Sequence, residues 1–430
     1  MNGTRDGEGS RRTAGTVPIV AEGQLRRTLG VSDAVVIGAG SMIGAGVFAA
    51  WSPAADAAGT GLLIGLAIAG VIAFCNATSS AELAAKHPRS GGTYVYGREQ
   101  LGHGWGHLAG WGFVVGKTAS CIAMALTVGA YLWPEQERLV AVLAAVVILL
   151  VNIGGLSRTV AVTKVLLTIS SAALLIVLVS GWSSDGFDLG RITPLDGGPL
   201  DWLRAAGFMF FAFAGYARIA TLGEEVKDPE TTIPRAIPLA LFGVLALYLV
   251  VGVTTLGSVD TTTIAATDAP LRAVVDTGGV DSLAPVVRIG AGIAALGVLL
   301  NLIPGISRVA LAMARNRELP PWFAHIDARR DLPLRAEITV AAVVVAGVLL
   351  LDLRSAIGIS GVAVLTYYAV TNAAALTLRG ADVRFPPVIA VVGLIGCIVL
   401  VFALPTAIVA SGLAVLLVGV GVRQIGLRLG

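Results

Sequence analysis

The sequence is short of charged residues. Only 13% of its 430 residues are Asp, Glu, Lys or Arg, against about 25% in soluble globular proteins. Hydrophobic residues make up 56% of the chain and the mean hydropathy is +0.84, which excludes an ordinary soluble domain and indicates an integral membrane protein. The formal net charge of +3 is too small to favour nucleic-acid binding.

Cysteine is also scarce. Cys75, Cys121 and Cys397 all lie in apolar runs, without the spacing of a disulfide framework or a zinc cluster. His103 and His107 have the four-residue spacing that could share a zinc ion on a helix, but three glycines over 102–106 argue against a helix and no HExxH glutamate is present. The sequence also has no P-loop and no nucleophile–base constellation. We therefore expect no metal, no cofactor and no enzymatic activity.

Long apolar runs fill most of the chain. Taking about 20 residues for each membrane-spanning helix, we expect twelve spans, with approximate limits 33–56, 61–85, 105–133, 138–154, 159–182, 202–224, 235–258, 283–315, 334–351, 357–379, 386–404 and 405–425. With the N-terminus inside, 21 Lys and Arg lie in cytoplasmic segments and six in external ones, as the positive-inside rule requires. The chain is therefore predicted to be a multi-pass protein of the cell membrane with both termini in the cytoplasm.

The segments outside the spans are predicted to be short. Residues 1–32 are polar and lack a cleavable signal, which is typical of a disordered tail. Residues 261–279 could form a short external helix, placed to cap a cavity.

Two of the apolar runs are interrupted by small residues. Residues 35–51 contain four glycines, at 38, 40, 44 and 46, and a second anomaly follows at 208–225. Irregular backbone survives in a membrane only where protein or a polar cavity satisfies its N–H and C=O groups. Two interrupted segments in corresponding halves are typical of secondary transporters. Close helix packing through the GxxxG spacing of Gly40 and Gly44 is the alternative.

Longer motifs extend this pattern. GSMIGAGVF in the first span is followed about 165 residues later by FAFAG…EEVKDP…IPRA, with a glycine- and tyrosine-rich element at 91–96 and SRVALAMARNRELPPWF at 307–323. Over roughly 33–379 the chain resembles the amino acid–polyamine–organocation (APC) superfamily of permeases, in the branch of cationic amino acid transporters and bacterial amino acid permeases.

The resemblance implies a fold. It is an all-α integral membrane protein with 12 transmembrane helices and a leucine-transporter-type 5+5 inverted repeat, in which helices 1 and 6 are broken. The tail (1–32) would be followed by the first repeat at 33–182, an external connector at 183–201, the second repeat at 202–379 and two further spans at 380–430.

The resemblance also implies a binding site for an amino acid at the two breaks. The substrate carboxylate would accept from backbone N–H groups at 44–46, because a helix N-terminus favours anions. Its ammonium would meet carbonyls of Met42 or Ile43, Phe211 and Ala214. Phe211 and Phe213 would supply an apolar wall. The predicted substrate-binding residues are Met42, Ile43, Gly44, Ala45, Gly46, Gly116, Lys117, Cys121, Phe211, Ala212, Ala214, Gly215 and Leu302.

The sequence departs from the arginine–agmatine exchangers at the residues that would contact the substrate side chain. Leu302 stands where those proteins have a tryptophan, and Ala217 replaces an acid. Lys117 lies near the membrane midplane and would repel a guanidinium. We therefore predict a neutral or acidic amino acid as substrate.

Energy coupling is the second departure. Ser170 stands where proton-coupled members have a lysine. Lys117 is therefore the candidate for proton coupling, and a permanently bonded structural cation is the alternative.

The leading hypothesis is secondary active transport of amino acids by alternating access, with proton-coupled uptake. An exchanger or uniporter, an amine substrate, and a non-transporting membrane sensor or partner subunit are the alternatives. The expected partners are the lipid bilayer, a small-molecule amino acid and, if uptake is coupled, protons. The sequence does not predict the oligomeric state or the roles of Arg218 and Arg308.

Overall fold

A computed structural model describes residues 29–87, 91–154, 160–216, 219, 226–278, 281–327, 329–330 and 332–429. Within these ranges the chain is helical and has no strand beyond isolated bridges. The helices are α1 (Val31–Met42), α2 (Ala45–Ala49), α3 (Trp51–Ala58), α4 (Leu62–Lys86), α5 (Thr93–Leu101), α6 (His103–Leu132), α7 (Glu137–Ile153), α8 (Val160–Ser183), α9 (Pro199–Phe213), α11 (Pro229–Ser258), α12 (Thr261–Ala266), α13 (Pro270–Thr277), α14 (Ala284–Arg315), α15 (Leu334–Leu350), α16 (Leu353–Ala375), α17 (Pro387–Ala403) and α18 (Thr406–Leu429).

The helices confirm a multi-pass membrane protein. Among the described residues, nine helical segments are long and apolar enough to cross a membrane. Three more of the predicted spans are shorter helices, α9 with 15 residues and α15 and α17 with 17 each. The count of twelve spans, the inverted repeat and its boundaries stay predictions.

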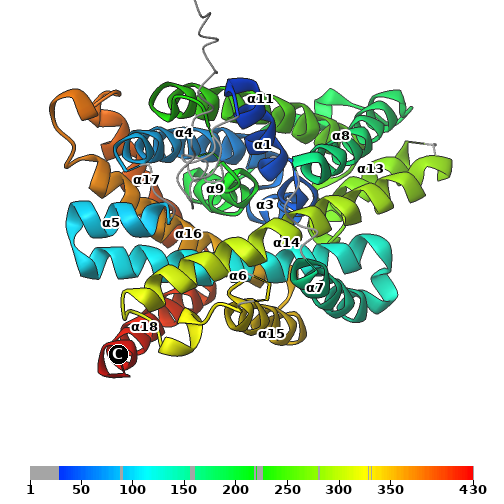
Figure 1. Ribbon diagram of the computed structural model, residues 1–430. Coiled ribbons are helices and arrows are strands. Elements are labelled where there is room, and N and C mark those ends of the chain that lie inside the picture. The colour runs from blue at the N-terminus through cyan, green and yellow to red at the C-terminus, as the bar shows by residue number, and fades with distance from the viewer. Residues whose placement is uncertain are drawn as a thin grey trace, which may run out of the picture.

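The centre of the molecule is built on α6. This helix packs against α14 along one side and α16 along another, and Figure 1 shows α6 and α14 crossing the middle of the bundle. α9 packs against α4, and α1 packs against α11. α17 and α18 lie at the edge of the bundle in this view. Among the described segments that could span a membrane, α6 is the most buried, and it contacts α2, which follows the first predicted break.

The start of α6 corrects one expectation. Glycines at 102, 104 and 106 argued against a helix around His103 and His107, but α6 begins at His103 and includes both. Gly106 has another use, since a Cβ built on it would lie 2.6 Å from the Cβ of Arg98 on α5. Glycine at this position allows α5 and α6 to approach closely, which a side chain would prevent.

Candidate functional site

The first break lies within the predicted stretch. α1 ends at Met42, then Ile43 (φ −74°, ψ 47°) and Gly44 (φ −105°, ψ −149°) leave helical geometry, and α2 begins at Ala45. Ala50 keeps right-handed helical angles, so α2 leads directly into α3. The carbonyl end of one helical segment and the amide end of the next therefore meet at residues 43–44.

The second break follows α9. This helix ends at Phe213, and residues 214–216 form turns. Bonds of the i→i+3 type run from Ala214 N to Phe211 O at 3.4 Å and from Tyr216 N to Phe213 O at 3.3 Å. Regular α-helical bonding is therefore interrupted at the end of the predicted stretch 211–215. The next residues, which include Ala217 and Arg218, lie outside the described part of the chain.

The two breaks touch each other through their backbones. A Cβ built on Gly46 would lie 2.7 Å from the Cα of Ala212, and one built on Gly215 would lie 2.1 Å from the carbonyl oxygen of Ser41. Real Cβ atoms do not approach other atoms so closely, so glycine is needed at both contacts. The glycines that predicted broken helices also bring the two breaks together.

Tyr248 of α11 joins the breaks by hydrogen bonds. Its buried hydroxyl lies 2.6 Å from the carbonyl oxygen of Met42 and 3.1 Å from that of Ala212. A hydroxyl has one proton, so it donates to one of these carbonyls at a time. Its ring packs 5.2 Å from that of Phe213. One side chain thus lies within hydrogen-bond distance of carbonyls of both interrupted helices.

Lys117 reaches the second break from the middle of α6. Its ammonium donates to the carbonyl oxygen of Ala214 at 3.0 Å, and the side chain is only 5% exposed. No carboxylate pairs with it among the described residues. Cys121 lies one turn further along α6 and is buried. The site therefore contains a buried ionisable group that is held by a carbonyl rather than by an opposite charge.

These contacts involve three of the carbonyls that the family resemblance assigns to a substrate ammonium. The oxygen of Met42 accepts from Tyr248, that of Phe211 from Ala214 N, and that of Ala214 from Lys117. A carbonyl oxygen has two lone pairs, so each can accept a second hydrogen bond.

Four further residues named from the sequence lie on α6, α8 and α14. A Cβ built on Gly116 would point at Val364 of α16, at 3.0 Å from its Cγ2. Leu302 is partly exposed, one turn along α14 from Val298, whose Cγ2 would lie 2.2 Å from a Cβ on Gly44. Ser170 donates to Leu166 O on its own helix. Arg308 is exposed on α14.

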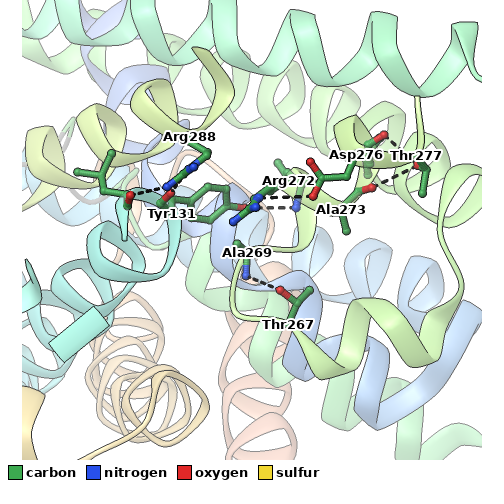
Figure 2. A network of polar contacts seen from close by, with 11 residues as sticks. Tyr131, Thr267, Ala269, Arg272, Ala273, Asp276, Thr277 and Arg288 are labelled. Atoms are coloured by element: carbon green, nitrogen blue, oxygen red, sulfur yellow. Dashed lines mark hydrogen bonds and ion pairs between the residues drawn. The ribbon is translucent and has the colours of Figure 1, made fainter. Parts of the chain in front are cut away.

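The helix predicted at 261–279 is present as two helices, α12 and α13, which pack against the segment after the first break. The hydroxyl of Tyr131 donates to Phe48 O on α2 at 2.9 Å and accepts from Leu271 N of α13 at 3.3 Å. Arg288 donates to the carbonyl oxygens of Tyr131 and Leu132 at 2.9 and 2.6 Å, at the C-terminal end of α6. Figure 2 shows Tyr131 beside Arg288. Helices α12 and α13 thus form a cover, and Tyr131 bonds this cover to the segment that follows the first break.

Two interrupted helices that meet each other are typical of one class of membrane protein, the secondary transporters. The comparison with protein families agrees, since the amino acid permease family matches residues 29–419. The chain belongs to this family, and it is a transporter of the APC superfamily rather than an enzyme.

Related proteins are also named as transporters or permeases. An uncharacterized transporter of Mycobacterium tuberculosis is 55% identical over 406 residues, which cover 94% of this chain and 92% of the relative. The branched-chain amino acid permease of Bacillus subtilis is 25% identical, with 93% and 92% covered. The vacuolar cationic amino acid transporter 4 of Arabidopsis thaliana is 27% identical, with 83% of this chain and 64% of the relative covered.

Sequence reasoning missed Tyr248. A faint signal was available, because this tyrosine is the one polar side chain in the apolar run LFGVLALYLVVGV at 241–253. A tyrosine hydroxyl buried in a membrane helix normally finds a hydrogen-bond partner. Its partners lie 206 and 36 residues away along the chain, so no local pattern could identify them.

Proposed function

We propose that this permease is a secondary active transporter that carries amino acids across the cell membrane by alternating access. In this proposal the fold is the leucine-transporter-type inverted repeat, both termini are cytoplasmic, and the substrate binds where the two broken helices meet. The observation that carries the proposal is the contact of the two breaks, with Lys117 and Tyr248 bonded to their carbonyls. Membership of the amino acid permease family supports the substrate class.

The ends of the broken helices suit the two charges of an amino acid. The backbone N–H groups of Gly44, Ala45 and Gly46 begin the helical segment after the first break and would donate to the carboxylate. The carbonyls of Met42 or Ile43, Phe211 and Ala214 would accept from the ammonium. Phe211, Ala212 and Gly215 would then line the substrate backbone, with Gly116, Cys121 and Leu302 toward its side chain.

Lys117 narrows the choice of substrate. A buried ammonium next to the site disfavours a substrate with a cationic side chain, because like charges repel strongly where the dielectric constant is low. Neutral or acidic amino acids are therefore the proposed substrates. The Bacillus subtilis relative described as a branched-chain amino acid permease agrees with a neutral substrate.

Lys117 is also the proposed proton carrier. Its hydrogen-bond acceptor is a neutral carbonyl and no carboxylate pairs with it in the described part of the chain, so loss of the proton leaves no carboxylate buried and unpaired. A buried lysine of this kind is suited to bind and release a proton during transport.

Purified protein in proteoliposomes tests the proposal. We expect a panel of labelled amino acids to identify neutral or acidic substrates that accumulate under an inward proton gradient. Lys117→Gln should abolish gradient-driven accumulation and leave exchange intact, whereas Lys227→Gln, at an exposed lysine, should change neither. Unchanged accumulation in Lys117→Gln would refute the carrier role. Uptake of none of the panel, without any thermal shift, would favour a non-transporting protein.

A further inference from the structure

A second buried polar cluster lies far along α6 from Lys117, where α5, α6, α18 and the turn after α14 meet. His107 of α6 is 5% exposed, and its Nε2 lies 2.8 Å from the carbonyl oxygen of Gly419 on α18. Its Nδ1 lies 3.7 Å from Oε2 of Glu318, which is 2% exposed. Neither Nδ1 of His107 nor Oε2 of Glu318 has a hydrogen-bond partner within the described residues.

The contact with Gly419 fixes the tautomer of His107. A carbonyl oxygen only accepts, so Nε2 must carry a proton and donate it. In the neutral ring Nδ1 then has no proton and is an acceptor. It faces a carboxylate oxygen, which is also an acceptor when ionised. The neutral form therefore places two buried acceptors opposite each other, an arrangement that stabilises neither.

Glu318 is held in place by the end of α14. Arg317 has a left-handed backbone (φ 60°), Arg317 N donates to Ala314 O and Glu318 N donates to Met313 O, both at 2.9 Å. This is the Schellman arrangement that closes helix C-termini, and it turns Glu318 back toward α5 and α6. Oε1 of Glu318 accepts from Nη1 of Arg98 on α5 at 3.0 Å.

We propose that His107 is a proton-binding site, at which a proton on Nδ1 forms an ion pair with Glu318 and fastens α6 to the turn after α14. The added proton turns the two facing acceptors into a donor and an acceptor. A shortening of the 3.7 Å separation by about 0.8–1.0 Å gives a charge-assisted hydrogen bond of about 2.7–2.9 Å. His107 then bonds both neighbours at once, α18 through Nε2 and Glu318 through Nδ1.

The other charged and titratable groups around the contact are few. Arg98 and Tyr94 of α5 are bonded to each other at 3.1 Å, and burial beside Glu318 raises the pKa of Tyr94 to about 12, so this phenol stays neutral. On α18, Arg423 lies one turn beyond Gly419 and its Nε is buried. On α6, His103 is exposed one turn before His107. Of these two histidines, His107 is the one that faces Glu318.

The sign of the pH effect follows from the partner. Protonation gains an ion pair in the folded protein that the unfolded chain lacks, so the contact stabilises this conformation at low pH and is lost as the pH rises. The stabilisation is independent of which solute the protein carries. A negative result for His107 would therefore leave the transport proposal standing, and a negative transport result would leave the His107 proposal standing.

Melting temperatures of the full-length protein at about pH 5.5 and about pH 8, on either side of the ordinary histidine range near 6.5, provide the test. We expect the wild-type protein to melt at a higher temperature at the lower pH. This difference should fall by at least about half in His107→Gln, which cannot gain the proton. The matched control is His103→Gln, which should keep the full difference.

Glu318→Gln provides a second variant that does not depend on the histidine change folding well. Its amide N–H₂ can donate to the unprotonated Nδ1, so the contact forms without a proton and the pH difference should again shrink. The proposal is overturned if the wild-type protein shows no difference, or if His107→Gln or Glu318→Gln keeps the wild-type difference in full.

Discussion

The hydroxyl of Tyr248 gives the sharpest test of the contact between the two breaks. Tyr248→Phe removes one oxygen atom and keeps the ring that packs on Phe213. The lost hydroxyl donates to the oxygen of either Met42 or Ala212, both of which belong to buried residues. A net hydrogen bond contributes about 0.5–1.5 kcal/mol, and leaving a buried acceptor unsatisfied costs about 1–3 kcal/mol. We therefore expect this conformation to lose about 1–3 kcal/mol, a factor of about 5–150 in its equilibrium constant.

The assay is the melting temperature of purified protein, and the chain contains a matched control. Tyr96 of α5 is also buried, but its hydroxyl has no hydrogen-bond partner in the described part of the chain. Tyr96→Phe removes the same atom without breaking a bond and should leave the melting temperature unchanged or raise it. Tyr248→Phe should melt several degrees lower. If the two variants melt at the same temperature, the hydroxyl of Tyr248 does not hold the breaks together.

Adding substrate provides a second test with the Tyr248→Phe variant. If the carbonyl of Met42 accepts from the substrate ammonium as proposed, a saturating substrate supplies the donor that Tyr248→Phe lacks. The increase in melting temperature on adding substrate should then be larger in the variant than in the wild-type protein. An equal increase in both would place the ammonium away from this carbonyl.

Three further predictions follow from single contacts. Gly46→Ala places a Cβ 2.7 Å from the backbone of Ala212, an overlap that costs about 1–3 kcal/mol, so this variant should take up less substrate into proteoliposomes. Gly104 has open space around it, so the control variant Gly104→Ala should keep the wild-type uptake. Arg317→Val puts a β-branched residue at φ 60° and should lower the melting temperature, whereas Arg317→Gly should not, and equal melting would show that the turn tolerates any residue. Tyr131→Phe removes the hydroxyl shared by Phe48 and Leu271, so amide hydrogen exchange in α13 should become faster, and an unchanged exchange rate would mean that the cover is held by other contacts.

The positions of the breaks were accessible from the sequence because their cause is local. Glycines and small residues at 38–46 and 212–215 change what the backbone can do at those residues, whatever lies around them. The observed interruptions at 43–44 and 214–216 lie within or directly beside the predicted stretches. The six glycines around 91–106 were harder to interpret, because the same residue type serves a turn at Gly92 (φ 51°) and close packing at Gly106.

The partners of buried polar side chains were not accessible in the same way. Lys117 was identifiable as a cation in an apolar span, but its bond to Ala214 joins residues 97 positions apart. His107 meets Glu318 and Gly419 only because α14 ends in a turn that reverses toward α6 and because α18 packs across the same end. Such contacts depend on the rotation of each helix about its axis, which hydrophobic periodicity defines poorly in helices that are apolar on nearly every face.

The strengths of the polar contacts also fit a protein that must change conformation. The cover of α12 and α13 is bonded through Tyr131, the breaks through Tyr248, and the opposite end of α6 through His107. Each contact is one or two hydrogen bonds, each of which contributes about 0.5–1.5 kcal/mol, and interhelical hydrogen bonds in membranes have similar values. A solute or a proton with a differential affinity of that size can shift the balance between two conformations, whereas a large, wholly apolar interface would leave it fixed. In the proposed transport cycle, variants that remove one of these contacts should therefore change the populations of the conformations without abolishing the fold.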